Sequence, residues 1–208
     1  MEKTLLSIGH GYSAKALARR LLAKGWRIIG TTRSADKVRA LESSGVKAIV
    51  WPGDSLPFSE VSHVLTSVSP GDDGDPVLKA HASEIAAAKH LKWVGYLSTT
   101  GVYGDHQGDW VDEETPLEPT TERGSARVRA EAAWASLGVP LHIFRLAGIY
   151  GPGRGPFSKV RSGKARRIIK EGQVFSRTHV EDIAQILEAS MDRPDPGRAY
   201  NVCDDDPA

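Results

Sequence analysis

A glycine-rich turn near the start of the chain constrains the fold more than any other feature. It follows a short apolar run, Thr4 to Ile8, and precedes a segment with apolar residues at helical spacing, 14–24. The first glycine permits a tight turn, the second lets the backbone approach an anion, and a small third residue keeps the helix close to the sheet. The sequence predicts a strand–turn–helix unit that binds a pyrophosphate at the helix N-terminus; a turn without a ligand is the alternative. Its residues are Gly9, His10, Gly11, Tyr12, Ser13 and Ala14.

Compact apolar runs alternate with helical patterns along the whole chain. Such alternation gives βαβ units and a parallel sheet that is covered on both faces. We therefore expect residues 1–208 to form one α/β domain, a Rossmann-like fold with a doubly wound parallel sheet. The expected strands are 4–8, 27–31, 47–51, 63–67, 93–98, 141–146 and 199–203, and the expected helices are 14–24, 35–43, 76–90, 127–137 and 180–191.

The residues after the second expected strand indicate which dinucleotide the turn binds. Enzymes that use NAD place an acid here, where it binds the ribose 2′-hydroxyl. This chain instead has Thr32, Arg33 and Ser34, and a guanidinium pairs well with a 2′-phosphate. The sequence predicts NADP in preference to NAD; alternatively, Arg33 is a solvated arginine at a helix start. We also expect Ser34 to cap the next helix. Asp54 is expected to face the adenine, and the alternative is an ordinary turn aspartate.

The composition limits the class of protein. Lys and Arg total 27 against 26 for Asp and Glu, a net charge of +1, whereas dedicated nucleic-acid binders carry a large basic excess. No apolar run approaches the roughly 18 residues of a membrane span, and the start does not read as a signal peptide. The single cysteine, Cys203, indicates a reducing compartment. We expect a cytoplasmic protein without nucleic-acid or membrane partners, and no metal site, because no His or Cys pair has ligand spacing.

Two oppositely charged segments interrupt the strand–helix alternation. Residues 104–122 carry seven acids and no Lys or Arg, and residues 154–170 carry seven bases and no acid. They belong to insertions at about 104–122 and 151–176, on the side where open α/β sheets bind ligands. Either both segments are solvated loops, or the basic one lines a site for an anionic substrate. The sequence ends just after the last expected strand, which leaves open whether a C-terminal part of the substrate region is absent.

Four further motifs resemble the extended short-chain dehydrogenase/reductase (SDR) superfamily, of the NAD(P)-dependent epimerase and dehydratase type. The resemblance covers nearly the whole chain. It implies an NAD(P)-binding protein in which a Ser or Thr, a Tyr and a Lys carry the chemistry. The motifs are LSTTGVYG at 97–104, RLAGIYGPGR at 145–154, RTHVEDIA at 177–184 and AYNV at 199–202.

The chain departs from this superfamily at the catalytic positions. The resemblance places the Ser/Thr role on Thr99, but the Tyr and Lys positions, counted from Glu131, hold Arg123 and Arg127. A guanidinium stays protonated, so Arg123 cannot be the general acid/base. Arg127 keeps the charge needed to hold a ribose or a phosphate. These changes, and a glycine turn that differs from the usual G-x-x-G-x-x-G, resemble the atypical branch of the superfamily.

Two functions are compatible with these residues. The first is an NADP-dependent oxidoreductase or epimerase of a small carbonyl or sugar-like, anionic substrate. Thr99 would orient the substrate. Tyr103 or Tyr150 would either replace the missing general acid/base or pack around the cleft. Arg123, Arg127 and Arg154 would bind the anionic group. The second is a non-catalytic module that senses NADP and acts through a protein partner. Tyr150 and Arg154 are the expected substrate contacts. If Arg123 and Arg127 do not bind an anion, we expect both to be solvated and paired with the acidic loop. The protein is expected to be a monomer or a homodimer.

Overall fold

The first apolar run forms β1 (Thr4–Ile8), whose five residues are all buried at the centre of a parallel sheet. The computed structural model describes residues 3–166, 169, 172 and 174–207. Seven strands lie in the order β3-β2-β1-β4-β5-β6-β9, and the order changes direction between β1 and β4, where open α/β sheets bind ligands. The other six are β2 (Arg27–Thr32), β3 (Lys47–Val50), β4 (His63–Thr66), β5 (Trp93–Thr99), β6 (Leu141–Leu146) and β9 (Ala199–Val202).

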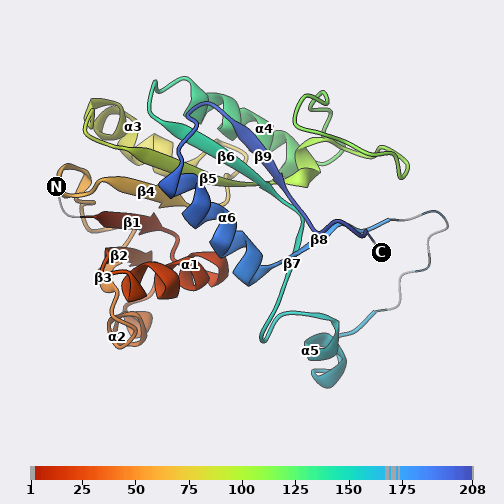
Figure 1. Cartoon of the computed structure of the whole chain (residues 1–208), viewed down its shortest axis with the longest axis horizontal. Coiled ribbons are helices and arrows are strands. Elements are labelled where there is room, and N and C mark those ends of the chain that lie inside the picture. The colour runs from red at the N-terminus through yellow and green to blue at the C-terminus, as the bar shows by residue number, and fades with distance from the viewer. Residues whose placement is uncertain (1–2, 167–168, 170–171, 173, 208) are drawn as a thin grey trace.

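Helices cover both faces of the sheet (Figure 1). On one face α1 (Tyr12–Ala23) packs against α6 (Val180–Asp192), and α3 (Pro76–Ala87) and α4 (Glu122–Ala135) cover the other. Neighbouring residues of one strand face opposite layers, so Leu5 packs with the α1–α6 layer and Leu6 with the α3–α4 layer. The predicted Rossmann-like fold with a doubly wound parallel sheet is confirmed.

The expected elements are present, with some different ends. α4 begins at Glu122, before the expected 127, because the Thr121 side chain caps it and accepts the Gly124 amide at 3.0 Å. The expected helix 35–43 is divided into a 3-10 turn, η1 (Ala35–Lys37), and the short α2 (Val38–Glu42). Ser34 stands at the predicted cap position, but its side chain makes no capping hydrogen bond, so that expectation was wrong.

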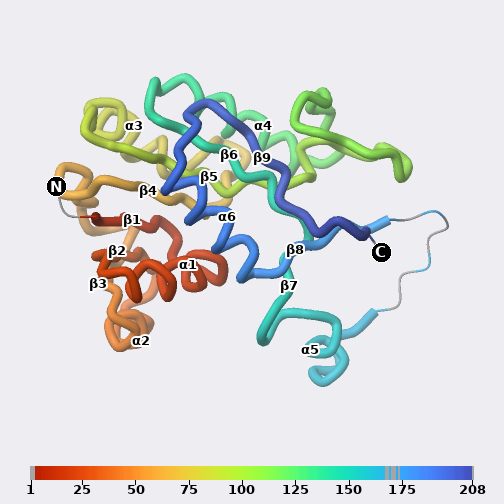
Figure 2. The backbone as a smooth tube through the Cα atoms, viewed as in Figure 1, coloured from red at the N-terminus to blue at the C-terminus, as the bar shows by residue number. Residues whose placement is uncertain are grey.

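The two charged segments project from one end of the sheet, on the right in Figure 1. Residues 104–121 form a loop. Three short elements that the sequence did not predict lie in and beside the second segment: α5 (Pro156–Arg161) is within it, and β7 (Gly148–Tyr150) and β8 (Arg177–His179) flank it. β7 and β8 pair in parallel as a separate two-stranded sheet (Figure 2). Arg167 and Lys170 of the basic segment lie outside the described residues. Two further 3-10 turns, η2 (Phe58–Glu60) and η3 (Thr100–Val102), precede β4 and follow β5.

Candidate functional site

The glycine turn joins the carboxyl ends of three strands. Gly9 follows β1 with φ +76°, a left-handed conformation that favours glycine. Its amide donates to Thr31 Oγ1 of β2 at 2.8 Å, and its carbonyl accepts a hydrogen bond from Ser67 Oγ just after β4. A Cβ at Gly9 would lie 3.0 Å from the Val68 side chain. The turn is therefore fixed at the point where the strand order reverses.

Gly11 leaves the N-terminus of α1 open. A Cβ built on Gly11 would meet only the Gly9 carbonyl, at 3.6 Å, and the helix has no side-chain cap. In the part of the chain that the structure describes, the amides of Tyr12, Ser13 and Ala14 donate to no protein acceptor. Free amides and the helix dipole favour an anion at such a position. The geometry fits the pyrophosphate of a dinucleotide, because the backbone is accessible and the donors are unpaired.

The side chain of His10, the second residue of the turn, packs against β2 and is only 7% exposed. Burial, with a contribution from Lys15, lowers its pKa to about 4, so the imidazole is neutral near pH 7. Its Nδ1 is buried and has no hydrogen-bond partner among the described residues. A Cβ at Gly30 of β2 would lie 2.8 Å from the His10 ring, so the ring needs glycine beneath it. His10 also lines a cavity of about 150 Å³ between α1 and the region of α2 and Val46; no sequence pattern indicated this cavity.

The three residues at the end of β2 differ in their surroundings. Thr32 and Ser34 bond to each other, with the Ser34 amide 3.3 Å from Thr32 Oγ1. Arg33 is exposed and has no hydrogen bond or ion pair with any other described residue. Asp54 is exposed in the turn after β3, where its amide donates to the Val50 carbonyl at 3.1 Å. Arg33 is thus free for an external anion, while the roles of all four residues toward a cofactor stay predictions.

The expected substrate-orienting residue stands at the carboxyl end of β5. Thr99 is half-buried, and its Oγ1 accepts the Gly101 amide at 3.2 Å at the start of η3. Its hydroxyl hydrogen remains available to a ligand, because that bond uses the oxygen only as an acceptor.

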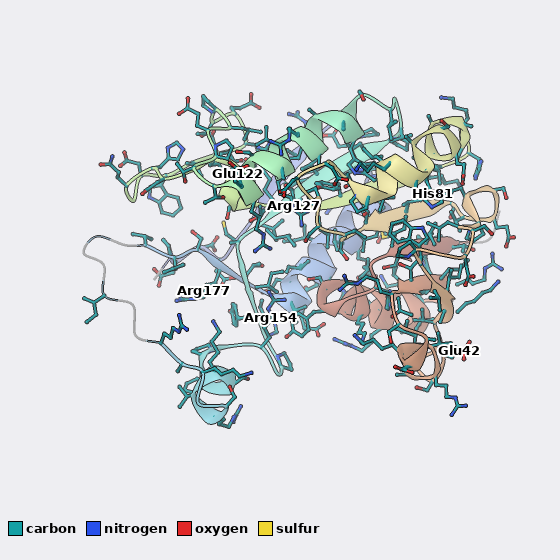
Figure 3. All side chains as sticks on the ribbon, turned by 180° about the vertical axis from the view of Figure 1, so that it is seen from behind. Glu42, His81, Glu122, Arg127, Arg154 and Arg177 are labelled. Carbon is teal, nitrogen blue, oxygen red and sulfur yellow. The ribbon has the colours of Figure 1, made fainter. Side chains whose placement is uncertain are left out.

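The two arginines of the altered site are both on α4, but their surroundings differ. Arg123 is exposed in the first turn, and its side chain bonds to no described residue. Arg127 is 6% exposed, and Figure 3 labels it beside α4. Its guanidinium donates to the Leu97 carbonyl at 2.6 Å, to Tyr96 Oη at 3.2 Å and to Ser69 Oγ at 3.1 Å.

All three acceptors of Arg127 are neutral. Burial of a charge is costly unless the charge is paired, and among the described residues no carboxylate forms an ion pair with Arg127. Ser69 lies in the loop that follows β4, and Leu97 is near the carboxyl end of β5, the neighbouring strand. Arg127 is therefore buried rather than a solvated partner of the acidic loop, whereas Arg123 is exposed, and their joint role toward an anion stays a prediction.

Tyr103 is fully enclosed in a polar network. Its hydroxyl donates to Asn201 Oδ1 of β9 at 2.8 Å and accepts from Arg145 Nη1 of β6 at 2.8 Å. Burial opposes the charge on Arg145, but hydrogen bonds to Glu131 and Tyr103 raise its pKa above the ordinary value. Both hydrogen-bonding functions of the Tyr103 hydroxyl are occupied. Its catalytic assignment stays a prediction, and the contacts themselves are those of a packing residue.

Glu131 is the centre of this network. Its carboxylate pairs with Arg145 at 3.0 Å and accepts the hydroxyl of Ser98. Arg145 also donates to the carbonyl of Glu113 at 3.3 Å, and the Glu113 carboxylate accepts the Asn201 amide at 2.6 Å. The network thus anchors the acidic segment to β5, β6, β9 and α4. The sequence analysis gave neither residue a structural role: Arg145 was the first residue of the motif at 145–154, and Glu131 was the position from which the Tyr and Lys positions were counted.

The second substrate-side segment touches the glycine turn. The Tyr12 hydroxyl donates to the Pro152 carbonyl at 3.0 Å, and the Arg154 guanidinium lies 5.6 Å from the Tyr12 ring centroid. A Cβ at Gly151 would be 2.7 Å from the Tyr12 hydroxyl, so only glycine permits this contact. Arg154 is on the turn that leads to α5 (Figure 3). Its guanidinium therefore lies beside the glycine turn, although the residue belongs to the second charged segment.

Tyr150, the other expected substrate contact, lies at the end of β7. Its ring meets the His179 ring edge-on, with centroids 5.1 Å apart. A hydrogen bond with Asp204, together with burial, raises the pKa of Tyr150. The raised pKa keeps its hydroxyl protonated near pH 7, where it can donate but is a weak base.

Within the described ranges, no group of three or more His, Cys, Asp or Glu side chains could hold a metal ion. Among the same residues, no helix has the length and apolar character that crossing a membrane requires.

Comparison with known proteins identifies the family. A model described as the NAD dependent epimerase/dehydratase family matches residues 77–203. The chain belongs to this family. The resemblance to extended SDR proteins is thereby confirmed, and membership in the epimerase/dehydratase family supports a nicotinamide dinucleotide as the cofactor.

Individual relatives agree with this assignment. Protein YeeZ of Escherichia coli (strain K12) is 30% identical over 97% of this chain and 77% of its own length. A functionally unknown conserved protein from Silicibacter pomeroyi DSS has a solved structure that is 60% identical, with a TM-score of 0.95 over 99% of this chain and 74% of that one. The enzyme WbmG of Bordetella bronchiseptica, solved with NAD and UDP, is 18% identical with a TM-score of 0.73. That match covers 99% of this chain and 74% of WbmG, and it shows a shared fold.

Proposed function

We propose that this epimerase/dehydratase-family chain binds NADP and acts as an oxidoreductase or epimerase on a small carbonyl or sugar-like substrate with an anionic group. The observation that carries the proposal is the open N-terminus of α1 beside an unpaired Arg33. The three free amides suit a pyrophosphate, and a free guanidinium at the end of β2 suits a 2′-phosphate. No acid is present at 30–35, where NAD enzymes place one.

Several residues of this chain would hold the dinucleotide. The backbone of Gly9–Ala14 receives the pyrophosphate, Arg33 with Thr32 and Ser34 receives the 2′-phosphate, and Asp54 faces the adenine. Arg154 stands beside Tyr12 and adds a positive charge next to the turn. When bound, the nicotinamide supplies a hydride donor or acceptor.

The substrate would lie between Thr99 and the two projecting segments. The hydroxyl of Thr99 orients a substrate oxygen, and Tyr150 and Arg154 contact the rest of the molecule. Arg123 is exposed and unpaired, so it binds an anionic group without first breaking a contact. Arg127 is held by three neutral acceptors, and its charge stabilises negative charge that develops nearby. Neither arginine accepts a proton, so these two positions contribute charge rather than acid/base chemistry.

Cofactor binding tests the first half of the proposal. Isothermal titration calorimetry with NADP and NAD should show a preference for NADP. Arg33→Asp should weaken NADP binding roughly tenfold or more, because a charge-assisted hydrogen bond contributes about 1.5–3 kcal/mol, and it should affect NAD much less. Arg39→Asp is the matched control, since Arg39 is also exposed but lies on α2. An equal loss for both cofactors in Arg33→Asp would refute the assignment to NADP.

Turnover tests the second half. A panel of neutral and anionic carbonyl compounds and sugar nucleotides is tested by NADPH absorbance for reduction and by chromatography of the products for epimerisation, which consumes no net NADPH. Arg123→Tyr with Arg127→Lys restores the usual superfamily pair and should weaken binding of the anionic substrates. Tight NADP binding without turnover on the panel favours a module that senses NADP and acts through a protein partner.

A further inference from the structure

A second group of cationic side chains lies at the opposite end of the sheet from the glycine turn. Lys3 precedes β1, Lys92 precedes β5, and His63 is the first residue of β4. A five-residue strand such as β1 rises about 3.3 Å per residue, so this end is about 16 Å from the turn. The group is therefore separate from both the dinucleotide turn and the substrate-side segments.

These three side chains line a cavity of about 170 Å³. Trp26, just before β2, and Met191, near the end of α6, form much of its apolar wall. A cavity of roughly 150 Å³ with apolar walls accommodates a benzene ring. The space thus suits a single aromatic ring with a small polar substituent.

The charges around the cavity favour an anion. Among the residues that the structure describes, Asp192 is the one acid that lines it, against two lysines. In the described part of the chain, neither Lys3 nor Lys92 forms an ion pair with a carboxylate. The Lys3 ammonium instead stands 5.4 Å from the Trp26 ring centroid. Both cations are therefore available to a ligand.

His63 adds a hydrogen-bonding group to this wall. It is 6% exposed, and its ring packs edge-on against Trp26 with centroids 4.7 Å apart. Its Nδ1 lies 2.8 Å from Ser62 Oγ, and among the described residues its Nε2 has no hydrogen-bond partner. The Ser62 hydroxyl has two acceptors within reach, His63 Nδ1 at 2.8 Å and the Thr4 carbonyl at 3.2 Å. When it donates to the nearer Nδ1, Nε2 carries the proton and can donate to a ligand. Burial and the two lysines lower the pKa of His63 to about 4, which keeps the ring neutral near pH 7.

We propose that this cavity is a binding site for a small aromatic carboxylate, separate from the dinucleotide and substrate sites. The ring packs against Trp26 and Met191, the carboxylate lies between Lys3 and Lys92, and His63 Nε2 donates a hydrogen bond to it. The site needs no residue of the proposed catalytic machinery.

Calorimetric titration of the full chain with benzoate tests the proposal. Saturable binding of benzoate is expected. Neutral benzamide and inorganic phosphate should each bind roughly tenfold or more weakly, because one lacks the charge and the other lacks the ring. Lys3→Gln with Lys92→Gln should weaken benzoate binding by a similar factor. Lys89→Gln, at another exposed lysine, is the matched control and should leave it unchanged.

Two outcomes would overturn the proposal. One is the absence of saturable benzoate binding at millimolar concentration in a folded sample. The other is benzoate binding that Lys3→Gln with Lys92→Gln leaves at its original affinity. NADP affinity is measured on the same variants and should not change, so this proposal and the proposed function can fail independently.

Discussion

The buried pair Glu131–Arg145 offers a direct test of how the acidic segment is held. Both side chains are nearly inaccessible, at 4% and 8% exposure, and their contact is 3.0 Å. Replacing Arg145 by Met leaves the Glu131 carboxylate buried with only Ser98 as a partner, and it removes the donor to Tyr103. Loss of one partner from a buried ion pair costs about 3–5 kcal/mol. We expect Arg145→Met and Glu131→Leu each to destabilise the protein by about this amount.

The measurements are urea unfolding, which gives the free energy of unfolding, and thermal unfolding, which gives Tm, both followed by tryptophan fluorescence. In a chain of this size about 2–4 °C of Tm corresponds to each kcal/mol, so a single variant should lose roughly 6–20 °C. The double variant removes both charges and should cost less than the sum of the two single variants. Arg198→Met is the control, because its pair with Asp195 is exposed and should contribute less than about 1 kcal/mol. Single variants that cost no more than this control would show that the pair does not stabilise the segment.

Two further predictions concern the glycine turn. Gly11→Val should abolish NADP binding in calorimetry, because the added side chain fills the open space at the helix N-terminus. The circular dichroism spectrum should stay native. Near-native affinity for NADP would contradict the interpretation of the turn. The pKa of His10 is lowered from 6.5 to about 4, so the unfolded chain binds more protons between these values and stability falls as pH falls from 6.5 toward 4. The shift corresponds to about 3 kcal/mol, and His10→Gln should flatten the curve of Tm against pH in this window relative to the parent chain; an unchanged curve would contradict the assigned cause.

The sequence predicted the framework because strong local signals define it. β6 was expected at 141–146 and is found there, since Gly138 and Pro140 end the preceding helix and four of the six residues that follow are apolar. The cap of α4 was missed because Thr121 and Gly124 lie in a polar stretch without helical periodicity. β7 and β8 were missed because each has three residues and is a strand only through pairing with the other.

The site was predictable to a smaller extent. The motif of Gly9–Ala14 fixed the turn, because strand, turn and helix are consecutive in the sequence. The different surroundings of Arg123 and Arg127 could not be foreseen from spacing alone, since four residues on a helix place two side chains on one face without fixing their depth. The network around Glu131 joins positions from 98 to 201, and only the fold brings these together.

The contact between Tyr12 and Pro152 makes the two halves of the site mechanically dependent. The hydroxyl of Tyr12 bonds to a carbonyl 140 residues away, across the boundary between the turn and the substrate segment. A substrate that shifts the 151–154 turn therefore changes the surroundings of the first residue of α1, and a dinucleotide on α1 changes the turn. Thermodynamic linkage requires the two effects on affinity to be equal. The affinity for one ligand, measured with and without the other, thus reports the free-energy coupling transmitted between the two halves of the site.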